Sequence, residues 1–304
     1  MKRLTALILC MAMLFSVSVN AAGADNEADT LQEKPAATMT KSEFADYAKA
    51  ASASNASRAA TMSQIDTTEL LRDYYFDGFT SDEVLHLEEY GIYLYNYQTN
   101  AEYEQERSLM TTAVGEPSMT YVMQPAVSFD ANTDEWTLVA GGQWTDLSWV
   151  PFFGGKIGGY ECVGYFFDNS NIEDLSTNQM PRIQEVTASL LSVTSNLNRE
   201  DREVINYNLN VNDENGVGSY MQDRSLLGGH YIGEHYAIVV VYDNRFENVT
   251  GDVSSYYVHT GDGTELTSVQ ILPVVVGNKA AILPVPTFTV EEKGFRQISN
   301  PLEL

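Results

Sequence analysis

The chain has 304 residues, of which 42 are acidic and 17 are basic, giving a formal net charge of −25. Proteins bind phosphate backbones and anionic lipid surfaces through clusters of Lys and Arg, and this sequence contains no such cluster. The composition therefore argues against nucleic-acid binding and against binding to a membrane surface.

Residues 1–24 carry the pattern of a secretory signal peptide. Lys2 and Arg3 precede an apolar run from Leu4 to Val19, and small residues follow at Ala21–Ala24. The apolar run is shorter than the roughly 20 residues that span a bilayer, and no second run of that length follows. We therefore expect a secreted, extracellular protein with no membrane anchor. Its net charge after cleavage would be about −27, because two basic residues leave with the signal.

Cysteine usage bears on the type of source organism. Cys10 lies in the signal segment, so Cys162 alone would remain and no intrachain disulfide could form. A chain of this length can bury enough surface to fold without such bridges. An exported protein without disulfides is more typical of a Gram-positive bacterium than of a eukaryote, so we expect a bacterial source.

Residues 25–65 are rich in Ala, Ser, Thr and charge, which predicts a flexible spacer without a core of its own. Thr40 and Glu43 have the spacing of a capping box, and Phe44 and Tyr47 follow at helical spacing. A short helix is therefore expected inside the spacer. The composition fits either a spacer or a removable pro-segment.

Residues 66–91 predict two short helices. Asp66 and Glu69 have capping-box spacing at the start of the first helix, as do Thr80 and Glu83 at the start of the second. Gly91 is a typical helix terminator.

Residues 66–300 are predicted to form a single globular domain. The part of this domain that follows the two helices is expected to be β-rich. Alternating runs of Val, Ile, Tyr, Phe and Thr occupy 92–97, 119–129, 136–144, 159–167, 186–194, 204–211, 236–242, 256–260, 266–276 and 281–290. Short strands without intervening long helices indicate a mainly β fold, an antiparallel β-sandwich-like domain preceded by two short helices. The alternation at 204–211 is the clearest, whereas 181–197 also fits helical spacing.

Three tryptophans, Trp136, Trp144 and Trp149, fall within 14 residues of each other. Exposed aromatic rings stack on sugar rings, so these residues are candidate ligand-binding residues for carbohydrate. The alternative is that they fill the sandwich core. Because Trp136 and Trp144 are an even number of positions apart, one strand would place both on the same face unless a bulge intervened at Gly141.

Asp130, Asn132 and Asp134 have the spacing of the first half of a calcium-binding loop, and calcium is the cofactor they would bind. Position six is Glu135 where an EF-hand has Gly, and position twelve is Gly141 where it has Glu. A polar hairpin turn is the alternative interpretation.

Cys162 and His235 form the one nucleophile–base pair that the sequence offers. The segment from His235 has a faint similarity to the His-bearing strand of papain-fold peptidases, although Cys162 lies in a predicted strand and not at a helix start.

The sequence therefore favours a non-catalytic extracellular protein that binds carbohydrate or another surface ligand. A secreted thiol hydrolase using Cys162 and His235 is the alternative.

Overall fold

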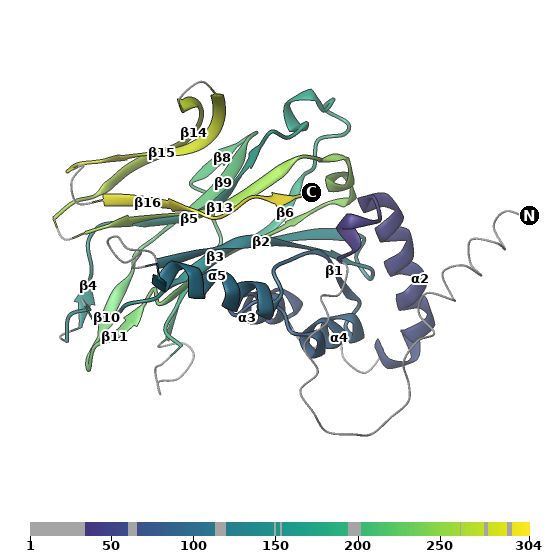
Figure 1. Ribbon diagram of the computed structural model, residues 1–304, viewed down its shortest axis with the longest axis horizontal. Coiled ribbons are helices and arrows are strands. Elements are labelled where there is room, and N and C mark those ends of the chain that lie inside the picture. Colours follow the sequence, from purple (N-terminus) through teal and green to yellow (C-terminus); the bar gives the residue numbers. More distant parts are fainter. Residues whose placement is uncertain are drawn as a thin grey trace, which may run out of the picture. The chain divides into compact units, whose positions relative to one another are not determined.

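Antiparallel strands dominate the computed structural model of the protein (Figure 1). The structure describes residues 34–59, 66–112, 120–148, 150–152, 154–193, 202–261, 263–276, 279–290 and 294–304. The predicted signal peptide, 1–24, lies outside these residues. The predicted mainly β, sandwich-like fold with helices before the sheets is confirmed.

The first of two large sheets has the strand order β1-β2-β3-β12-β6-β7, with antiparallel neighbours throughout. Its strands are β1 (Ile92–Asn96), β2 (Thr120–Asp130), β3 (Glu135–Trp144), β6 (Ile183–Leu191), β7 (Glu203–Asn206) and β12 (His235–Tyr242).

The second large sheet has the order β16-β13-β5-β9-β8, and β17 also pairs with β13. Its strands are β5 (Glu161–Asp168), β8 (Val211–Asp213), β9 (Gly216–Met221), β13 (Asp252–Thr260), β16 (Gly294–Ile298) and β17 (Leu302–Glu303). In both sheets an interior strand, β12 or β13, comes late in the chain.

Two smaller sheets flank this pair. The three-stranded sheet β11-β10-β4 lies at the left-hand end in Figure 1 and consists of β4 (Gly155–Lys156), β10 (Arg224–Leu226) and β11 (His230–Ile232). The two-stranded sheet consists of β14 (Leu266–Val276) and β15 (Lys279–Phe288).

The two large sheets pack face to face over an aromatic core. Alternate residues of each strand point inward, so Trp136 on β3, Tyr165 on β5 and Tyr257 on β13 share one cluster. The rings of Tyr236 on β12 and Tyr257 are stacked at 3.9 Å between centroids. This contact joins the middle of the first sheet to the middle of the second.

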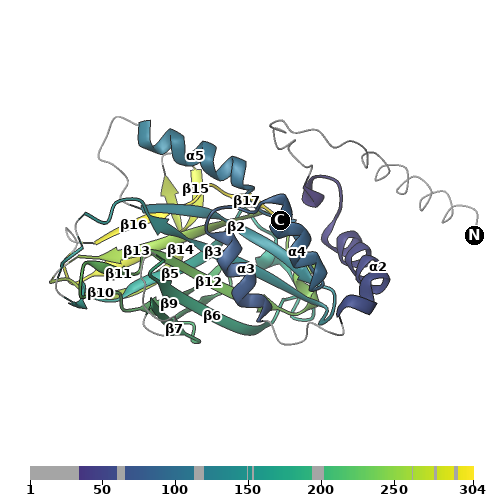
Figure 2. The same cartoon turned by 90° about the horizontal axis from the view of Figure 1, so that it is seen from below.

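Further layers cover the outer faces. Leu71, Leu87 and Tyr103 of three helices pack on the outer side of the first sheet, and Figure 2 shows these helices from below. Ile271 of β14 packs on the outer side of the second sheet. The helices are α2 (Lys41–Ala59), α3 (Thr67–Tyr75), α4 (Ser81–Glu89) and α5 (Asn100–Thr112), with short 3₁₀ turns η1 (Pro35–Ala37), η2 (Ile172–Asp174) and η3 (Asn244–Asn248). No helix in the described ranges is both long and apolar enough to cross a lipid bilayer.

The helix starts follow the predicted capping chemistry. The Asp66 carboxylate accepts hydrogen bonds from two backbone amides at the start of α3, and Thr80 and Glu83 form a reciprocal capping box at α4. Gly91 ends this helical segment with φ +83°. Thr99 and Glu102 make the same reciprocal contacts at α5, a helix that was not predicted from the sequence.

The predicted flexible spacer is wrong for the part that forms α2. Phe44, Ala45 and Ala48 of α2 are buried in the core, and α2 belongs to the same compact unit as the sheets. Burial of this aromatic and small-residue face explains the difference, because it attaches an otherwise polar helix to the sandwich. Residues 60–65 lie outside the described ranges.

The predicted continuous strand at 204–211 is also wrong. The chain leaves the first sheet at Asn206 and enters the second at Val211, and Tyr207 between them is 66% exposed. Asn206 donates from its side chain to Ser219 Oγ at 2.8 Å, and the Asn210 side chain accepts from the Tyr220 amide at 2.7 Å. These Asn side chains replace ladder hydrogen bonds where the chain crosses between sheets. The ambiguous segment 181–197 contains strand β6 rather than a helix.

Candidate functional site

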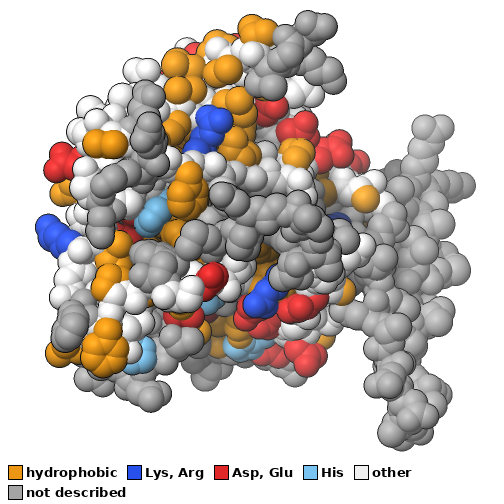
Figure 3. Space-filling model, turned by 60° about the vertical axis from the view of Figure 1, so that its left-hand side comes forward, with side chains coloured by type: hydrophobic (Ala, Val, Ile, Leu, Met, Phe, Trp, Pro, Cys, Tyr) orange, Lys and Arg blue, Asp and Glu red, His pale blue; other side chains and the backbone are white. Residues whose placement is uncertain are grey.

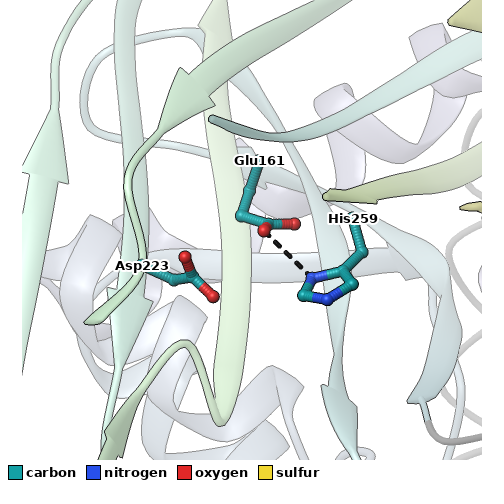
Figure 4. Close-up of side chains that lie close together, drawn as sticks. All are labelled: Glu161, Asp223 and His259. Carbon is teal, nitrogen blue, oxygen red and sulfur yellow. Dashed lines mark ion pairs between the residues drawn. The ribbon is translucent and has the colours of Figure 1, made fainter. Parts of the chain in front are cut away.

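Three ionisable side chains meet inside the sandwich near the end that carries β4, β10 and β11 (Figure 4). Glu161 begins β5, His259 lies near the end of neighbouring β13, and Asp223 follows β9 on the other side of β5. One potential ligand atom from each lies within 4.8 Å of the other two. We call these residues the Glu–Asp–His cluster.

Strand alternation explains why these polar groups face the interior. Cys162 packs in the outer cluster with Val258, whereas Val163 and Tyr257 pack between the sheets. Glu161 has the parity of the inward residues on its strand, and His259 has the same parity as Tyr257. The His259 Nδ1 atom lies 2.9 Å from Glu161 Oε1.

Burial controls the electrostatics of the cluster. The side chain of Glu161 is 1% exposed, and its Oε2 atom has no hydrogen-bond partner among the described residues. Asp223 Oδ2 accepts a hydrogen bond from the Tyr231 hydroxyl at 2.6 Å. Burial, reinforced by the negative charge of Glu161, raises the pKa of Asp223 to about 9. Asp223 is therefore protonated near neutral pH when only the chain's own groups surround it.

A basic groove lies next to the cluster. It has a volume of about 890 Å³ and includes Lys156 of β4, Arg224 of β10 and Val204 of β7 in its lining. Gln222 connects the groove to the Glu–Asp–His cluster, because it lines the groove and directly precedes Asp223. Its Nε2 atom donates a hydrogen bond to the carbonyl of Gly159 at 2.7 Å. Figure 3 brings this end of the molecule forward and shows basic and hydrophobic side chains on one face.

Lys156 and Arg224 lie directly opposite each other in the antiparallel pair β4–β10. Both side chains are exposed, and neither forms an ion pair within the described part of the chain. Like charges in directly opposed positions destabilise a strand pair. The groove thus holds two adjacent cations that the described chain leaves uncompensated.

The tryptophans do not form an exposed platform in the described structure. Trp136 and Trp144 share a face, as the even spacing predicts, because β3 pairs with β12 in unbroken register past Gly141. That face is the inner one. Trp136 is fully buried there, and the centroid of the Trp144 ring lies 4.9 Å from that of the His259 ring. The prediction that these two bind ligand as exposed rings is wrong because core packing covers both. Trp149 lies outside the described residues.

The three predicted calcium ligands lie at the end of β2 (Asp130) and in the turn that leads to β3 (Asn132 and Asp134). Asp130 accepts a hydrogen bond from the Asn132 amide at 2.7 Å, and the Asn132 side chain donates to the Tyr90 carbonyl at 2.7 Å. Asp134 forms an ion pair with Lys49 at 2.6 Å. These contacts give each side chain a role in the turn, and calcium binding there stays a prediction.

The structure does not bring Cys162 and His235 together. Cys162 is buried in the middle of the outer cluster beneath β14, and burial raises the pKa of its thiol to about 12. His235 contacts Phe76 on the helix-covered side of the other sheet. The two side chains therefore point to opposite outer faces of the sandwich. The thiol-hydrolase alternative lacks the nucleophile–base contact that it requires.

His235 is expected to make folding sensitive to acid. Burial lowers the pKa of its imidazole to about 4, with a smaller contribution from the Arg107 charge. The neutral ring contributes its full stabilisation above the unfolded-state pKa of about 6.5. As pH falls from there toward 4, this contribution to the free energy of unfolding is lost, by up to about 1.4 kcal/mol per pH unit. Urea denaturation of the His235→Gln variant should show a shallower fall over this range than the wild type. Parallel pH profiles would contradict this assignment.

No protein-family model matches this sequence, and no curated protein matches it.

Proposed function

We propose that the protein is a secreted, non-catalytic, carbohydrate-binding β-sandwich that holds an acidic glycan in the basic groove. The observation that carries the proposal is the opposed pair Lys156 and Arg224, which face each other without an acidic partner among the described residues. Carboxylate or sulfate groups on a glycan would supply the missing negative charge.

Apolar surface beside the groove favours a sugar over a simple anion. Leu227 lines the groove and is 78% exposed, and the neighbouring Gly228 amide donates to the Phe152 carbonyl at 3.2 Å. The Phe152 ring is 65% exposed. Sugar rings present C–H faces that pack on such aromatic and aliphatic surfaces, while their acidic substituents reach nearby cations.

The net charge, −25 for the full chain and about −27 without residues 1–24, repels a polyanion, but this repulsion acts over a limited distance. At physiological ionic strength the Debye length is about 8 Å, so exposed carboxylates elsewhere on the protein are largely screened from the groove. Short-range contacts between the glycan and the side chains of Lys156 and Arg224 then determine the affinity. Binding should be measured at this ionic strength, since lower salt restores the general repulsion.

Affinity electrophoresis tests the proposal with polygalacturonate as the acidic glycan and dextran as the neutral one. We expect retardation by polygalacturonate and not by dextran. Arg224→Glu should weaken the binding about tenfold, which corresponds to ~1.4 kcal/mol. Arg107→Glu is the matched control, because it reverses the same charge on an exposed side chain of α5 and should leave binding unchanged.

Two results would overturn the proposal. One is the absence of retardation by polygalacturonate. The other is equal retardation of the wild type and the Arg224→Glu variant. Circular dichroism of each variant shows that the fold is retained.

A further inference from the structure

We propose that Glu161, Asp223 and His259 bind one divalent transition-metal ion, with Zn²⁺ as the ion that fits best. The inference concerns the interior of the sandwich and does not depend on glycan binding in the groove.

The geometry of the Glu–Asp–His cluster suits a small ion. Three atoms within 4.8 Å of one another share a central point no more than about 2.8 Å from each. Zinc binds imidazole nitrogen and carboxylate oxygen at about 2.0–2.2 Å. Each ligand atom therefore needs to move by less than about 1 Å, which is within the reach of side-chain rotation.

The unsatisfied oxygen of Glu161 is a second and independent indication. Its Oε2 atom is buried and has no hydrogen-bond partner among the described residues. A buried acceptor without a partner costs about 1–3 kcal/mol, and more when it is charged. A cation held between the three side chains would remove this cost.

The donor set selects the class of metal. One imidazole nitrogen with two carboxyl groups suits Zn²⁺ and related transition metals, whereas Ca²⁺ and Mg²⁺ favour sites built from oxygen alone. No thiolate takes part, because Cys162 faces the opposite side of β5.

Surrounding groups would hold the ligands in place. The Tyr231 hydroxyl donates to Asp223, and the Thr260 amide donates to Glu161 Oε1 at 3.3 Å. Trp144 and Phe295 lie against the His259 ring, with centroids 4.9 and 5.1 Å away. Hydrogen bonds to carboxylate ligands and an apolar shell around an imidazole are typical supports of a metal site.

The alternative is a self-contained network in which His259 pairs with Glu161 and Asp223 bonds to the Tyr231 hydroxyl. Such a network needs no metal. The two arrangements differ in whether the chelator-treated protein binds zinc with a defined stoichiometry.

Calorimetric titration of the chelator-treated full chain with Zn²⁺ at pH 7.5 tests the proposal. We expect one tight site per chain in the wild type. Binding at this site should weaken by at least about 100-fold in His259→Gln and in Glu161→Gln. His235→Gln is the matched control, since it removes an equally buried histidine from the other sheet and should keep the site.

Substitution with Co²⁺ gives a readout that weak binding to surface carboxylates would not produce. A bound Co²⁺ ion with a histidine ligand should absorb visible light in the wild type and in His235→Gln, but not in His259→Gln. Zn²⁺ should also raise the melting temperature of the wild type and leave that of the isosteric Glu161→Gln variant unchanged.

The proposal is overturned if the wild type has no stoichiometric site, or if Glu161→Gln and His259→Gln bind Zn²⁺ as tightly as the wild type. The Arg224→Glu variant separates this inference from glycan binding. It should lose glycan affinity and keep the metal site.

Discussion

Replacing Arg72 with methionine is expected to lower the free energy of unfolding by about 3–5 kcal/mol. Arg72 lies on α3 and is 2% exposed, and it pairs with Glu203 of β7, whose side chain is 5% exposed. It also donates to Ser189 Oγ on β6 at 2.9 Å. The substitution leaves the Glu203 carboxylate buried without the guanidinium, and removing one partner of a buried ion pair is far more costly than removing both.

Urea denaturation measures this effect, and two further variants define its origin. The double variant Arg72→Met with Glu203→Met should recover most of the lost stability, because apolar side chains can replace a complete buried pair. Asp73→Asn should change stability by less than about 1 kcal/mol, because Asp73 is half exposed although it also contacts Arg72 at 2.9 Å. A loss below 1 kcal/mol for Arg72→Met alone would contradict the expected role of this pair.

Trp136→Ala is the second substitution with a large expected effect, a loss of about 3–5 kcal/mol in the free energy of unfolding. The Trp136 ring is fully buried and lies 5.0 Å from the ring of Phe129 and 5.7 Å from that of Tyr95. It also contacts Phe44, which attaches α2 to the sheet. Alanine would therefore leave a cavity where α2 packs against the first sheet.

Tyr207→Ala is the matched control for this aromatic truncation. Tyr207 lies at the crossing between the sheets and is largely exposed, so its removal should change stability by no more than about 0.5 kcal/mol. Chemical denaturation of both variants compares a buried ring with an exposed one. Equal losses would contradict the placement of Trp136 in the core and of Tyr207 on the surface.

Local patterns predicted the fold well where local chemistry decides the structure. The side chains at Asp66 and Thr80 cap helices because they can satisfy free backbone amides whatever the tertiary context. The same spacing at Thr99 and Glu102 could have identified α5. Alternation failed at 204–211, because Asn206 and Asn210 form side-chain hydrogen bonds that only the opposite strand makes available.

The Glu–Asp–His cluster was not predicted, because its members are far apart in the sequence and meet only through strand pairing. A partial signal existed, since Glu161 and His259 both fall within predicted apolar strands at positions of inward parity. A charged residue at such a position indicates an interior partner. Which residue provides that partner depends on the order β13-β5-β9, and alternation alone does not determine strand order.

The late position of β12 and β13 has a consequence for how the chain folds. β12 joins β3 to β6, so the first sheet is divided into two parts until residues 235–242 are available, and β13 must pair with β5 before β16 can extend the second sheet. An N-terminal fragment ending before β12 would expose the unpaired edges of β3 and β6 together with half of the aromatic core. Pairing between such distant segments is slow, so the sandwich closes only when β12 and β13 have paired and not strand by strand along the chain.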